Sequence, residues 1–212
     1  MRSYQDPCGV ARALDLVGDR WALLVVRELM LGPKRFTDLH RDLPGSSQNV
    51  LSQRLRELEE AGVVRRRKIP PPAVVWVYEL TEWGLGLEPV LTHLGRWGSQ
   101  APITTTNQVG VTSLVLALKA MYLPGFEAGF ELRVLRGREE EVFHVETSLT
   151  DIAVGRGPAA RPDAVLRGEA AALATVLLQG ADLRESVASG ELEIAGDAAA
   201  VARLVDHLAT SA

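Results

Sequence analysis

The first hundred residues alternate between apolar stretches at helical spacing and short turns rich in glycine and proline. Residues 9–17 place apolar side chains three or four positions apart, which predicts a helix ended by Gly18. A second helix is predicted over residues 21–31, with Asp19 in the N-cap position and a Gly-Pro pair as its stop. Its near-continuous apolar run indicates burial on most sides. A third, shorter helix is predicted over residues 36–43.

The fourth predicted helix, over residues 47–61, has an apolar side and a polar side. Ser46 or Ser47 is expected to cap it, and Gly62 is expected to end it. One stripe of the helical wheel collects Leu51, Leu55 and Leu58. The opposite side collects Asn49, Ser52, Gln53 and Arg56. Such a helix can pack on a small core through its leucines and present its polar side to a partner.

The pattern then changes to the alternation that is typical of strands. A first strand is predicted to begin at Val63 and to run through four consecutive cations, Arg65, Arg66, Arg67 and Lys68. Residues 70–72 are all proline and mark a turn, because proline cannot donate to a strand ladder. A second strand is predicted over residues 74–80. Helices joined by short turns and followed by such a hairpin, or wing, indicate a winged helix-turn-helix domain.

A last helix of the first half is predicted from residue 81 onward, and a polar stretch follows it. We place a linker at residues 101–110, between a domain at residues 1–100 and a second at 111–212. The second half is predicted to contain helices near 111–122, 169–178, 183–188 and 198–208, and strands near 130–136, 142–147, 152–155, 164–166 and 192–194. This order predicts an α+β fold with an antiparallel sheet covered by helices.

Length and composition fit this two-domain interpretation. The chain has 212 residues, of which 47% are apolar, so each half can bury a core. It has no apolar run of membrane-spanning length, no visible secretory signal and a single cysteine. We therefore expect a cytoplasmic protein without an internal disulfide and without a membrane partner.

The net charge of −4 is divided unevenly between the two halves. Residues 1–100 hold 14 Lys and Arg against 12 Asp and Glu, and residues 101–212 hold 9 against 15. The cations of the first half cluster around the third helix, the fourth helix and the wing. Local charge matters more than the total for attracting phosphates, so the first half is the candidate for binding double-stranded DNA.

The polar side of the fourth helix carries the groups that read base edges. Arginine pairs with guanine and asparagine with adenine through two hydrogen bonds each, which makes Arg56 and Asn49 the first candidates. Ser52 and Gln53 are also expected at base edges, and Ser47 and Gln48, at the start of the helix, are further DNA-binding candidates. At the start of the third helix, cations and backbone amides can hold a phosphate together, and the candidates are Lys34, Arg35 and Thr37.

The four wing cations are further candidates for phosphate contact. Because they alternate along a strand, we expect about half of them to face DNA. The others are expected to pair with Glu57, Glu59 or Glu60.

The sequence gives little support for an enzymatic function. The four histidines, His40, His93, His144 and His207, are scattered and have no metal-ligand spacing. The chain has neither a G-x-S-x-G motif nor a phosphate-binding loop. We therefore expect no catalytic site, no metal and no cofactor.

The first hundred residues resemble the HxlR-type family of bacterial winged-helix transcriptional regulators. The matching segments are Cys8, ARALDLVGDRW (11–21), LLVVRELMLGPKRFTDLHRDLPG (23–45), NVLSQRLRELEEAGVVRR (49–66) and YELTEWGLGLEPVLTHLGRW (78–97). The resemblance implies a homodimer whose first and last winged-helix-domain helices make the contact. It also implies that the fourth helix enters the major groove. The implied dimer residues are Val10, Leu14, Val90, Leu94 and Trp97. The alternative for each of them is a place in the core of its own chain.

The chain departs from this family at two positions. The family often has proline after the cysteine and proline before the recognition-helix asparagine, whereas this chain has Gly9 and Gln48. Gln48 adds a polar side chain at the start of the helix, so the operator sequence need not be inherited. Some family members sense oxidants or electrophiles through a cysteine near Cys8. The alternative is a packed thiol without such a role.

The last hundred residues resemble sterol-carrier-protein-type domains. The resemblance rests on ELRV…EVFHVET, PDAVLRGEAAALATVLLQG and GELEIAGDAAAVARLVDHL. It implies an apolar pocket between helices and sheet, and hence a module that binds a small apolar ligand or supports the dimer.

Two functional hypotheses follow from these observations. In the first, the protein is a homodimeric transcriptional regulator on a roughly palindromic operator. In the second, it carries a hydrophobic ligand or lipid and uses the winged helix only for dimerisation.

Overall fold

The computed structural model describes residues 3–70, 72, 74–102 and 109–208. The chain forms two compact units, Met1–Leu91 and Thr92–Ala212, which are considered separately below. Of the predicted linker at residues 101–110, residues 103–108 lie outside the described residues. Among the described residues, none of the helices combines the length and the apolar character that a membrane span requires.

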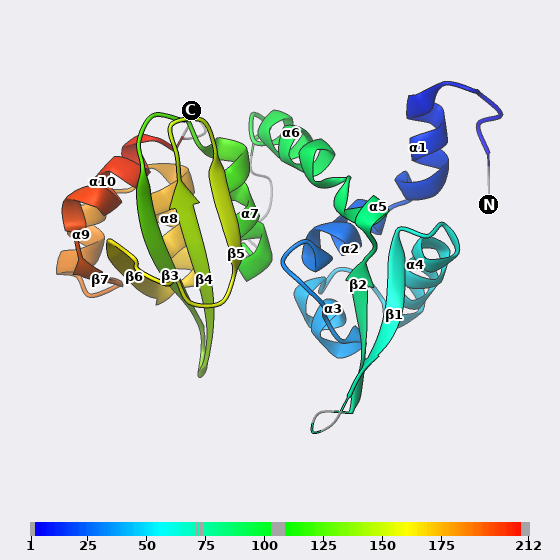
Figure 1. Ribbon diagram of the computed structural model, residues 1–212, viewed down its shortest axis with the longest axis horizontal. Coiled ribbons are helices and arrows are strands. Elements are labelled where there is room, and N and C mark those ends of the chain that lie inside the picture. The colour runs from blue at the N-terminus through cyan, green and yellow to red at the C-terminus, as the bar shows by residue number, and fades with distance from the viewer. Residues whose placement is uncertain (1–2, 71, 73, 103–108, 209–212) are drawn as a thin grey trace. The chain divides into compact units, whose positions relative to one another are not determined.

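The first unit is a winged helix-turn-helix, as the sequence predicted (Figure 1). Its elements are α1 (Gly9–Val17), α2 (Ala22–Leu29), α3 (Phe36–Asp42), α4 (Gln48–Glu60), β1 (Val64–Ile69), β2 (Val75–Leu80) and α5 (Glu82–Leu85). The next helix, α6 (Glu88–Gly98), continues past the division between the units. The predicted boundaries differ from the observed ones by only a few residues.

The core of this unit forms where α2, α3 and α4 meet. Leu51, Leu55 and Leu58 of α4 are buried together with Val25 and Leu29 of α2. These leucines are the stripe that the helical wheel predicted. Their burial orients α4, because the side of the helix opposite the leucines must then point outward.

Two local predictions in this unit are wrong. Asp19 does not cap α2; Trp21 occupies that position in a left-handed conformation, and Asp19 pairs with Arg54 of α4. The predicted final helix is divided into α5 and α6. Thr81 caps α5 by accepting from Gly84 N at 3.0 Å, and α5 ends at Gly86.

The wing is an antiparallel pair in which Arg66 lies opposite Tyr78 and Lys68 opposite Trp76. Its base is widened by a bridge to the segment before α3. Lys34 N donates to Tyr78 O at 3.0 Å, and Tyr78 N donates to Lys34 O at 2.8 Å. The backbone at Lys34 therefore joins the edge of β2 and fixes the start of α3 beside the wing.

The second unit is a five-stranded sheet with helices packed on it (Figure 1). Its elements are α7 (Val111–Met121), β3 (Ala128–Arg136), β4 (Glu139–Thr147), β5 (Ile152–Arg156), β6 (Ala164–Glu169), α8 (Ala170–Gln179), α9 (Leu183–Ala188), β7 (Leu192–Gly196) and α10 (Ala198–Asp206). The strand order is β5-β4-β3-β6-β7. The predicted α+β class is thus observed.

The prediction of an antiparallel sheet is wrong at one pair, because β3 and β6 run parallel. The segment between β5 and β6 makes this arrangement possible by crossing the sheet. Ala159 N in that segment donates to the carboxylate of Glu131 on β3 at 3.1 Å. Glu131 is buried and also accepts from Arg133 Nε at 2.8 Å. Its carboxylate therefore links β3 to the segment that connects β5 and β6.

The interior between α7 and the sheet is filled by side chains. Leu114, Val115 and Leu118 of α7, and Leu132 and Phe143 of the sheet, all have 0% exposure. A void large enough for water would give its lining side chains accessible surface, so no such void touches these five residues. The apolar pocket that the sterol-carrier resemblance implied is therefore not formed between them.

Candidate nucleic-acid interface

The start of α4 is fixed by a serine cap. Ser47 Oγ accepts a hydrogen bond from Val50 N at 3.3 Å, so Ser47, rather than Ser46, is the N-cap. Ser46 is instead buried and donates to Leu43 O at 2.8 Å. This cap satisfies one of the amides that every helix start leaves unpaired and sets where the first turn begins.

The outward side of α4 presents most of the predicted base-reading residues. Ser47, Gln48, Asn49, Gln53 and Arg56 are exposed, and Ser52 is half-buried. With the leucines buried, Asn49, Ser52, Gln53 and Arg56 lie on the opposite side of the helix, and Ser47 and Gln48 lie at its start. We call this set of six residues the α4 polar face.

An apolar residue missed by the sequence analysis also lies among them. Val50 is 36% exposed in the first turn of α4. A branched methyl side chain beside polar groups can contact the methyl group of thymine. The helical wheel could have predicted this exposure, since Val50 falls outside the stripe of leucines.

Two side chains of α4 are engaged within the unit. Gln53 Nε2 donates to Glu57 Oε1 at 2.9 Å. Arg54, which was not a candidate, is half-buried and pairs with Asp19 and Glu57. The carboxylate of Glu57 therefore offsets charge on this flank of the helix, while Arg56 lies outside these contacts.

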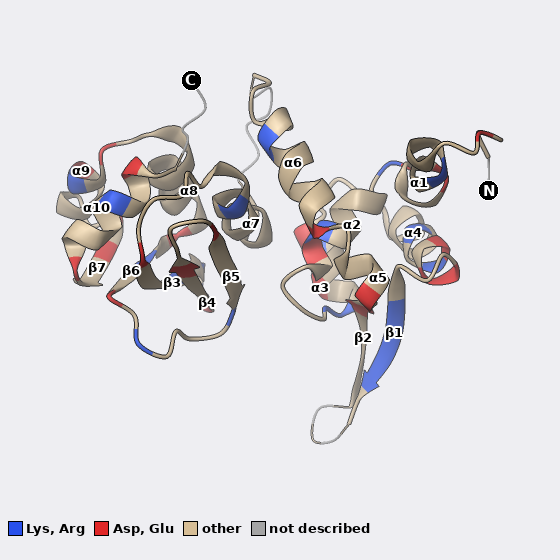
Figure 2. Cartoon of the chain, turned by 45° about the horizontal axis from the view of Figure 1, so that its top comes forward, with Lys and Arg blue, Asp and Glu red and all other residues tan. Residues whose placement is uncertain are grey.

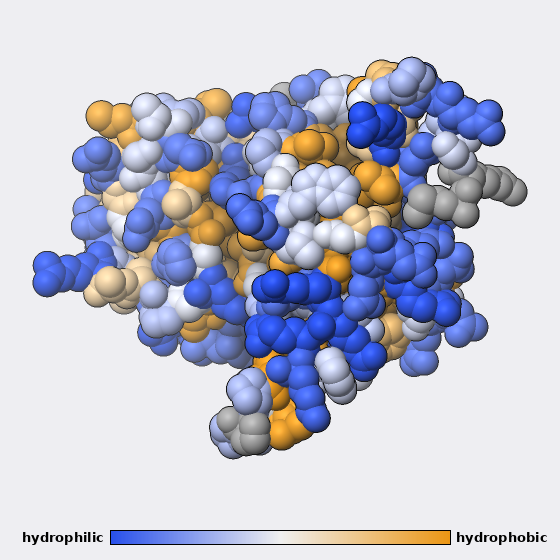
Figure 3. Space-filling view, turned by 45° about the vertical axis from the view of Figure 1, so that its right-hand side comes forward, coloured by the Kyte–Doolittle hydropathy of each residue, from blue (hydrophilic) through white to orange (hydrophobic). Residues whose placement is uncertain are grey.

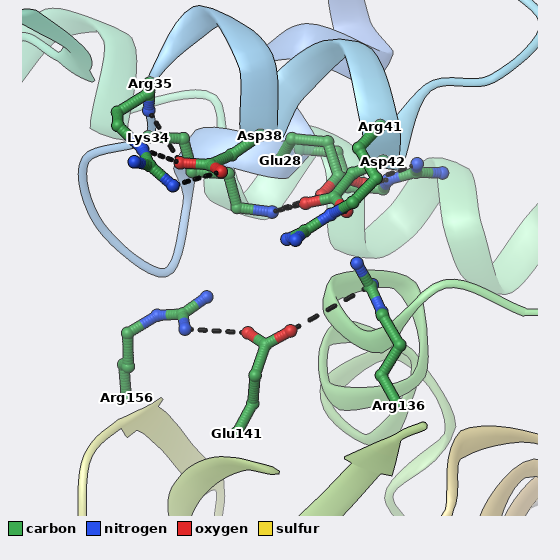
Figure 4. A network of polar contacts seen from close by, with 10 residues as sticks. Glu28, Lys34, Arg35, Asp38, Arg41, Asp42, Arg136, Glu141 and Arg156 are labelled. Carbon is green, nitrogen blue, oxygen red and sulfur yellow. Dashed lines mark hydrogen bonds and ion pairs between the residues drawn. The ribbon is translucent and has the colours of Figure 1, made fainter. Parts of the chain in front are cut away.

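Lys34 is a correction to the predicted phosphate site. Its ammonium lies 2.7 Å from Glu28 Oε2 and 2.7 Å from Asp42 Oδ2, with side-chain exposures of 8%, 2% and 5% for the three residues (Figure 4). A buried ammonium held by two carboxylates is not available to a phosphate on the surface. Lys34 instead joins α2 to the end of α3, and its role is structural.

Arg35 and Thr37 remain on the surface at the start of α3. The Arg35 guanidinium pairs with Asp38 at 2.8 Å, and this hydrogen bond holds the pKa of the Asp38 carboxyl below its usual value (Figure 4). Arg35 N also donates to Asp38 Oδ2 at 3.3 Å. Asp38 thus offsets part of the positive charge on which the prediction for Arg35 depended.

The wing carries its cations along β1 (Figure 2). Arg65 Nε lies 2.7 Å from Glu79 Oε1, and Arg67 Nη2 lies 2.9 Å from Glu79 Oε2. The hydrogen bond from Arg67, with a smaller contribution from Arg65, lowers the pKa of Glu79. The expected pairing with Glu57, Glu59 or Glu60 is wrong, because the strand register brings Glu79 opposite Arg65.

Cys8 is exposed and occupies the N-cap position of α1. Interaction with the backbone N–H group of Val10, and to a lesser extent with that of Ala11, lowers the pKa of its thiol. Partial positive charge at a helix start stabilises a thiolate, and the sequence pattern around Cys8 did not indicate this contribution.

The five residues implied as dimer contacts, Val10, Leu14, Val90, Leu94 and Trp97, are all exposed. The alternative, a place in the core of the chain, is therefore wrong for each of them. In the first unit, a cavity of about 400 Å³ lies between α1 and α5 and is lined by residues that include Ala13, Leu16, Trp83 and Leu87. Exposed apolar side chains of α1 beside an apolar cavity are typical of a surface that binds another protein.

The model of the HxlR-like helix-turn-helix family matches residues 16–104. The chain is similar to the uncharacterized HTH-type transcriptional regulator YvaP of Bacillus subtilis, with 40% identity over 89 residues, which are 42% of this chain and 82% of YvaP. It is also similar to the HTH-type transcriptional regulator YodB of Bacillus subtilis, with 40% identity over 88 residues, or 42% of this chain and 79% of YodB.

Solved structures of similar proteins overlap the same part of the chain. The reduced form of YodB from B. subtilis has a TM-score of 0.41 and 38% identity, over 45% of this chain and 94% of that chain. The redox regulator HypR in its oxidized form has a TM-score of 0.43 and 33% identity, over 46% of this chain and 100% of that chain. On the sequence matches, the chain belongs to the HxlR-like helix-turn-helix family through its N-terminal half.

Proposed function

We propose that the protein is a transcriptional regulator that binds double-stranded DNA as a homodimer and reads a roughly palindromic operator with α4. The observation that carries this proposal is the division of α4 into three buried leucines and the exposed α4 polar face. A helix held in this way can enter a major groove with its polar side toward the bases. The related proteins YvaP and YodB are themselves described as HTH-type transcriptional regulators.

Within this proposal, Arg56 pairs with guanine and Asn49 with adenine, while Ser47, Gln48, Ser52 and Gln53 contact nearby bases or phosphates. Thr37 and the first amides of α3 hold a backbone phosphate, with Arg35 beside them. A two-fold dimer would place its two copies of α4 about one DNA turn (~34 Å) or a small multiple apart.

Salt dependence of binding tests the proposal. Each phosphate neutralised by a cation releases counterions, so the logarithm of the binding constant should fall linearly with the logarithm of salt concentration. Fluorescence anisotropy of the full chain on duplex DNA, between low and moderate salt, measures this slope. A binding constant that barely changes with salt would contradict a role for phosphate contacts.

The dimer is proposed to form through the exposed apolar residues of α1 and α6. Leu94→Glu is expected to shift the protein toward monomer in sedimentation velocity, because it places a charge in an apolar contact. Leu24→Glu is the matched control, since Leu24 is an exposed leucine of α2, outside both helices. Leu24 is 38% exposed and Leu94 is 44% exposed. Equal effects of the two substitutions would contradict the assignment of α6.

A second candidate function is redox or electrophile sensing through Cys8. The observation that favours it is the exposed thiol at the start of α1 with a lowered pKa. Among the similar structures, HypR is named a redox regulator and one structure of YodB is described as quinone-bound. On this proposal, modification of Cys8 changes the dimer and so changes operator binding.

The rate at which iodoacetamide alkylates Cys8 rises with pH as the thiol ionises. We expect the midpoint of this rise to lie at a lower pH in the folded protein than in urea. The amides of α1 stabilise the thiolate only when the helix is formed, so the folded thiol ionises first as the pH rises. Cys8 is the single cysteine of the chain, so the reaction reports on it alone, and Cys8→Ser provides the blank. Equal titration midpoints with and without urea would remove the basis for a sensing role.

The second unit, proposed as a separate domain, is assigned a role in supporting the dimer rather than in carrying a ligand. The observation behind this choice is the filled interior between α7 and the sheet. A lipid or other apolar ligand that copurifies with the full chain in stoichiometric amount would favour the carrier hypothesis instead.

A further inference from the structure

The helix α1 is attached to the first unit mainly through its last turn. Of its nine residues, Val17 is the buried one, and Leu16 packs partly against the core. Val10 and Leu14, which are proposed dimer contacts, are 69% and 43% exposed. In Figure 3 hydrophobic (orange) patches lie between hydrophilic (blue) surface at the upper right, where α1 lies. The direction of α1 relative to α4 therefore depends on few buried contacts.

A cavity of about 600 Å³ lies between the N-terminal arm (residues 3–8), α1 and α4. Its lining residues include Tyr4, Leu14, Asp15, Gln53 and Glu57. The arm is held by α1, because Ser3 Oγ donates to Asp15 Oδ2 at 3.0 Å and Tyr4 N donates to Asp15 Oδ1 at 2.9 Å. Side-chain packing on this side of α1 therefore does little to fix the helix against α4.

An ion pair connects α4 to the turn that follows α1. The guanidinium of Arg54 on α4 contacts Asp19 Oδ2 and Glu57 Oε2 through the same nitrogen, Nη1. Asp19 comes directly after Gly18, the residue that caps the end of α1. The Arg54 side chain is 14% exposed, so its guanidinium faces the protein and is not available to a phosphate. Its pair with Asp19 ties α4 to the end of α1.

Glu57 extends this link to the α4 polar face. Its other carboxylate oxygen, Oε1, accepts from Gln53 Nε2 at 2.9 Å. The contacts thus run from Asp19 through Arg54 and Glu57 to Gln53, which is one of the proposed DNA contacts. Charged hydrogen bonds are directional, so such a chain favours one position of α4 beside the end of α1, even where it adds little to stability.

In a two-fold dimer, the position of α4 relative to the dimer contact sets the distance between the two reading helices. Inserting one base pair moves two half-sites apart by about 3.4 Å and rotates one relative to the other by about 35°. A dimer whose α4 helices are held firmly can distinguish operators that differ by this amount. A dimer whose α4 helices can shift against α1 binds several spacings with similar affinity.

We propose that Arg54 is a positioning residue for DNA recognition, because its ion pair with Asp19 holds α4 in one position relative to α1 and makes the protein selective for half-site spacing. Arg54 itself contacts no base in this arrangement. The inference rests on the proposed function, since it requires a dimer that contacts itself through α1 and binds DNA through α4.

The test uses the full chain, the two-fold symmetric site that it selects from random DNA, and duplexes with one base pair inserted or removed between the half-sites. We expect the unmodified chain to bind the selected spacing about tenfold more tightly than either altered spacing, a loss similar to that of one mismatched base pair. Arg54→Met, which keeps an unbranched side chain without the guanidinium, should bring this ratio close to one. Its affinity for a duplex with a single half-site should stay unchanged, because the base contacts of α4 remain.

A second variant keeps the test decisive if Arg54→Met fails to fold. Asp19→Asn removes the charge at the other end of the pair, where the side chain is 67% exposed, and should lose the spacing ratio to the same extent. Asp15→Asn is the matched control, since Asp15 lines the same cavity but binds the N-terminal arm. This control should retain the ratio.

Three results would overturn the inference and leave the proposed function intact. The first is a spacing ratio near one for the unmodified chain, and the second is an unchanged ratio in both Arg54→Met and Asp19→Asn. The third is a loss of the ratio in Asp15→Asn equal to that in Asp19→Asn, because the effect would then not depend on the pair with Arg54. Failure of the unmodified chain to bind any duplex would instead overturn the proposed function itself.

Discussion

Lys34→Ala is expected to lower the free energy of unfolding by about 3–5 kcal/mol, the usual cost of removing one partner from a buried ion pair. The substitution leaves Glu28, which is 2% exposed, without the ammonium that lies 2.7 Å from it. Arg27 Nη2 still lies 2.7 Å from Glu28 Oε1, so the loss is expected near the lower end of this range. The substitution also removes the contact between that ammonium and Asp42, so the end of α3 loses its tie to α2. Denaturant unfolding of the full chain, followed by tryptophan fluorescence, measures the change.

The neighbouring cation supplies the control for this experiment. Arg35 forms an exposed ion pair with Asp38, so Arg35→Ala should cost less than about 1 kcal/mol. The backbone N–H group of residue 35 still donates a hydrogen bond to Asp38 in the variant. Similar small losses for the two variants would show that Lys34 lies in a solvated environment and that its assignment as a structural residue is wrong.

Arg56→Ala is expected to weaken binding to the selected operator by about 10–100-fold, or 1–3 kcal/mol, because one bidentate contact to a guanine is lost. Asn49→Ala should have an effect of the same kind at an adenine. Both residues are exposed on α4 and lie on the side opposite its buried leucines, so neither substitution should alter the fold. Anisotropy titrations on the operator, with circular dichroism to monitor the fold, measure both effects.

Arg184→Ala controls for the loss of a positive charge alone. Arg184 is an exposed arginine on α9 of the second unit, distant in sequence from the α4 polar face. Its removal should leave operator affinity within about twofold, since Arg184 is not among the proposed DNA contacts and a single surface charge is screened at moderate salt. A loss as large as that of Arg56→Ala would indicate that the affinity depends on overall charge and not on base contacts.

The sequence predicted the scaffold of the interface because periodicity reports burial directly. The spacing of Leu51, Leu55 and Leu58 was sufficient to orient α4 and so to place Asn49 and Arg56 on its outward side. Local patterns also located β1 and β2 to within a residue. Such features depend on neighbours in the sequence, which a helical wheel or an alternation captures.

Apart from the cap of α2 and the division between α5 and α6, the errors concern contacts that bring different elements together. Lys34 follows a Gly-Pro turn and is read as a surface cation; its burial depends on Glu28 and Asp42 converging from two helices. Glu79 was missed as the partner of Arg65 because the strand register sets that pairing. In the second unit, alternation located β3 and β6 but contains no information about the parallel direction in which they pair.

The central claim, that the α4 polar face reads DNA sequence, is tested most directly by selecting duplexes from a random pool with the full chain and with its Asn49→Ala/Arg56→Ala variant. We predict that the unmodified chain enriches a two-fold symmetric motif containing guanine and adenine positions, and that the folded variant no longer enriches it. Enrichment of the same motif by both proteins would contradict the claim.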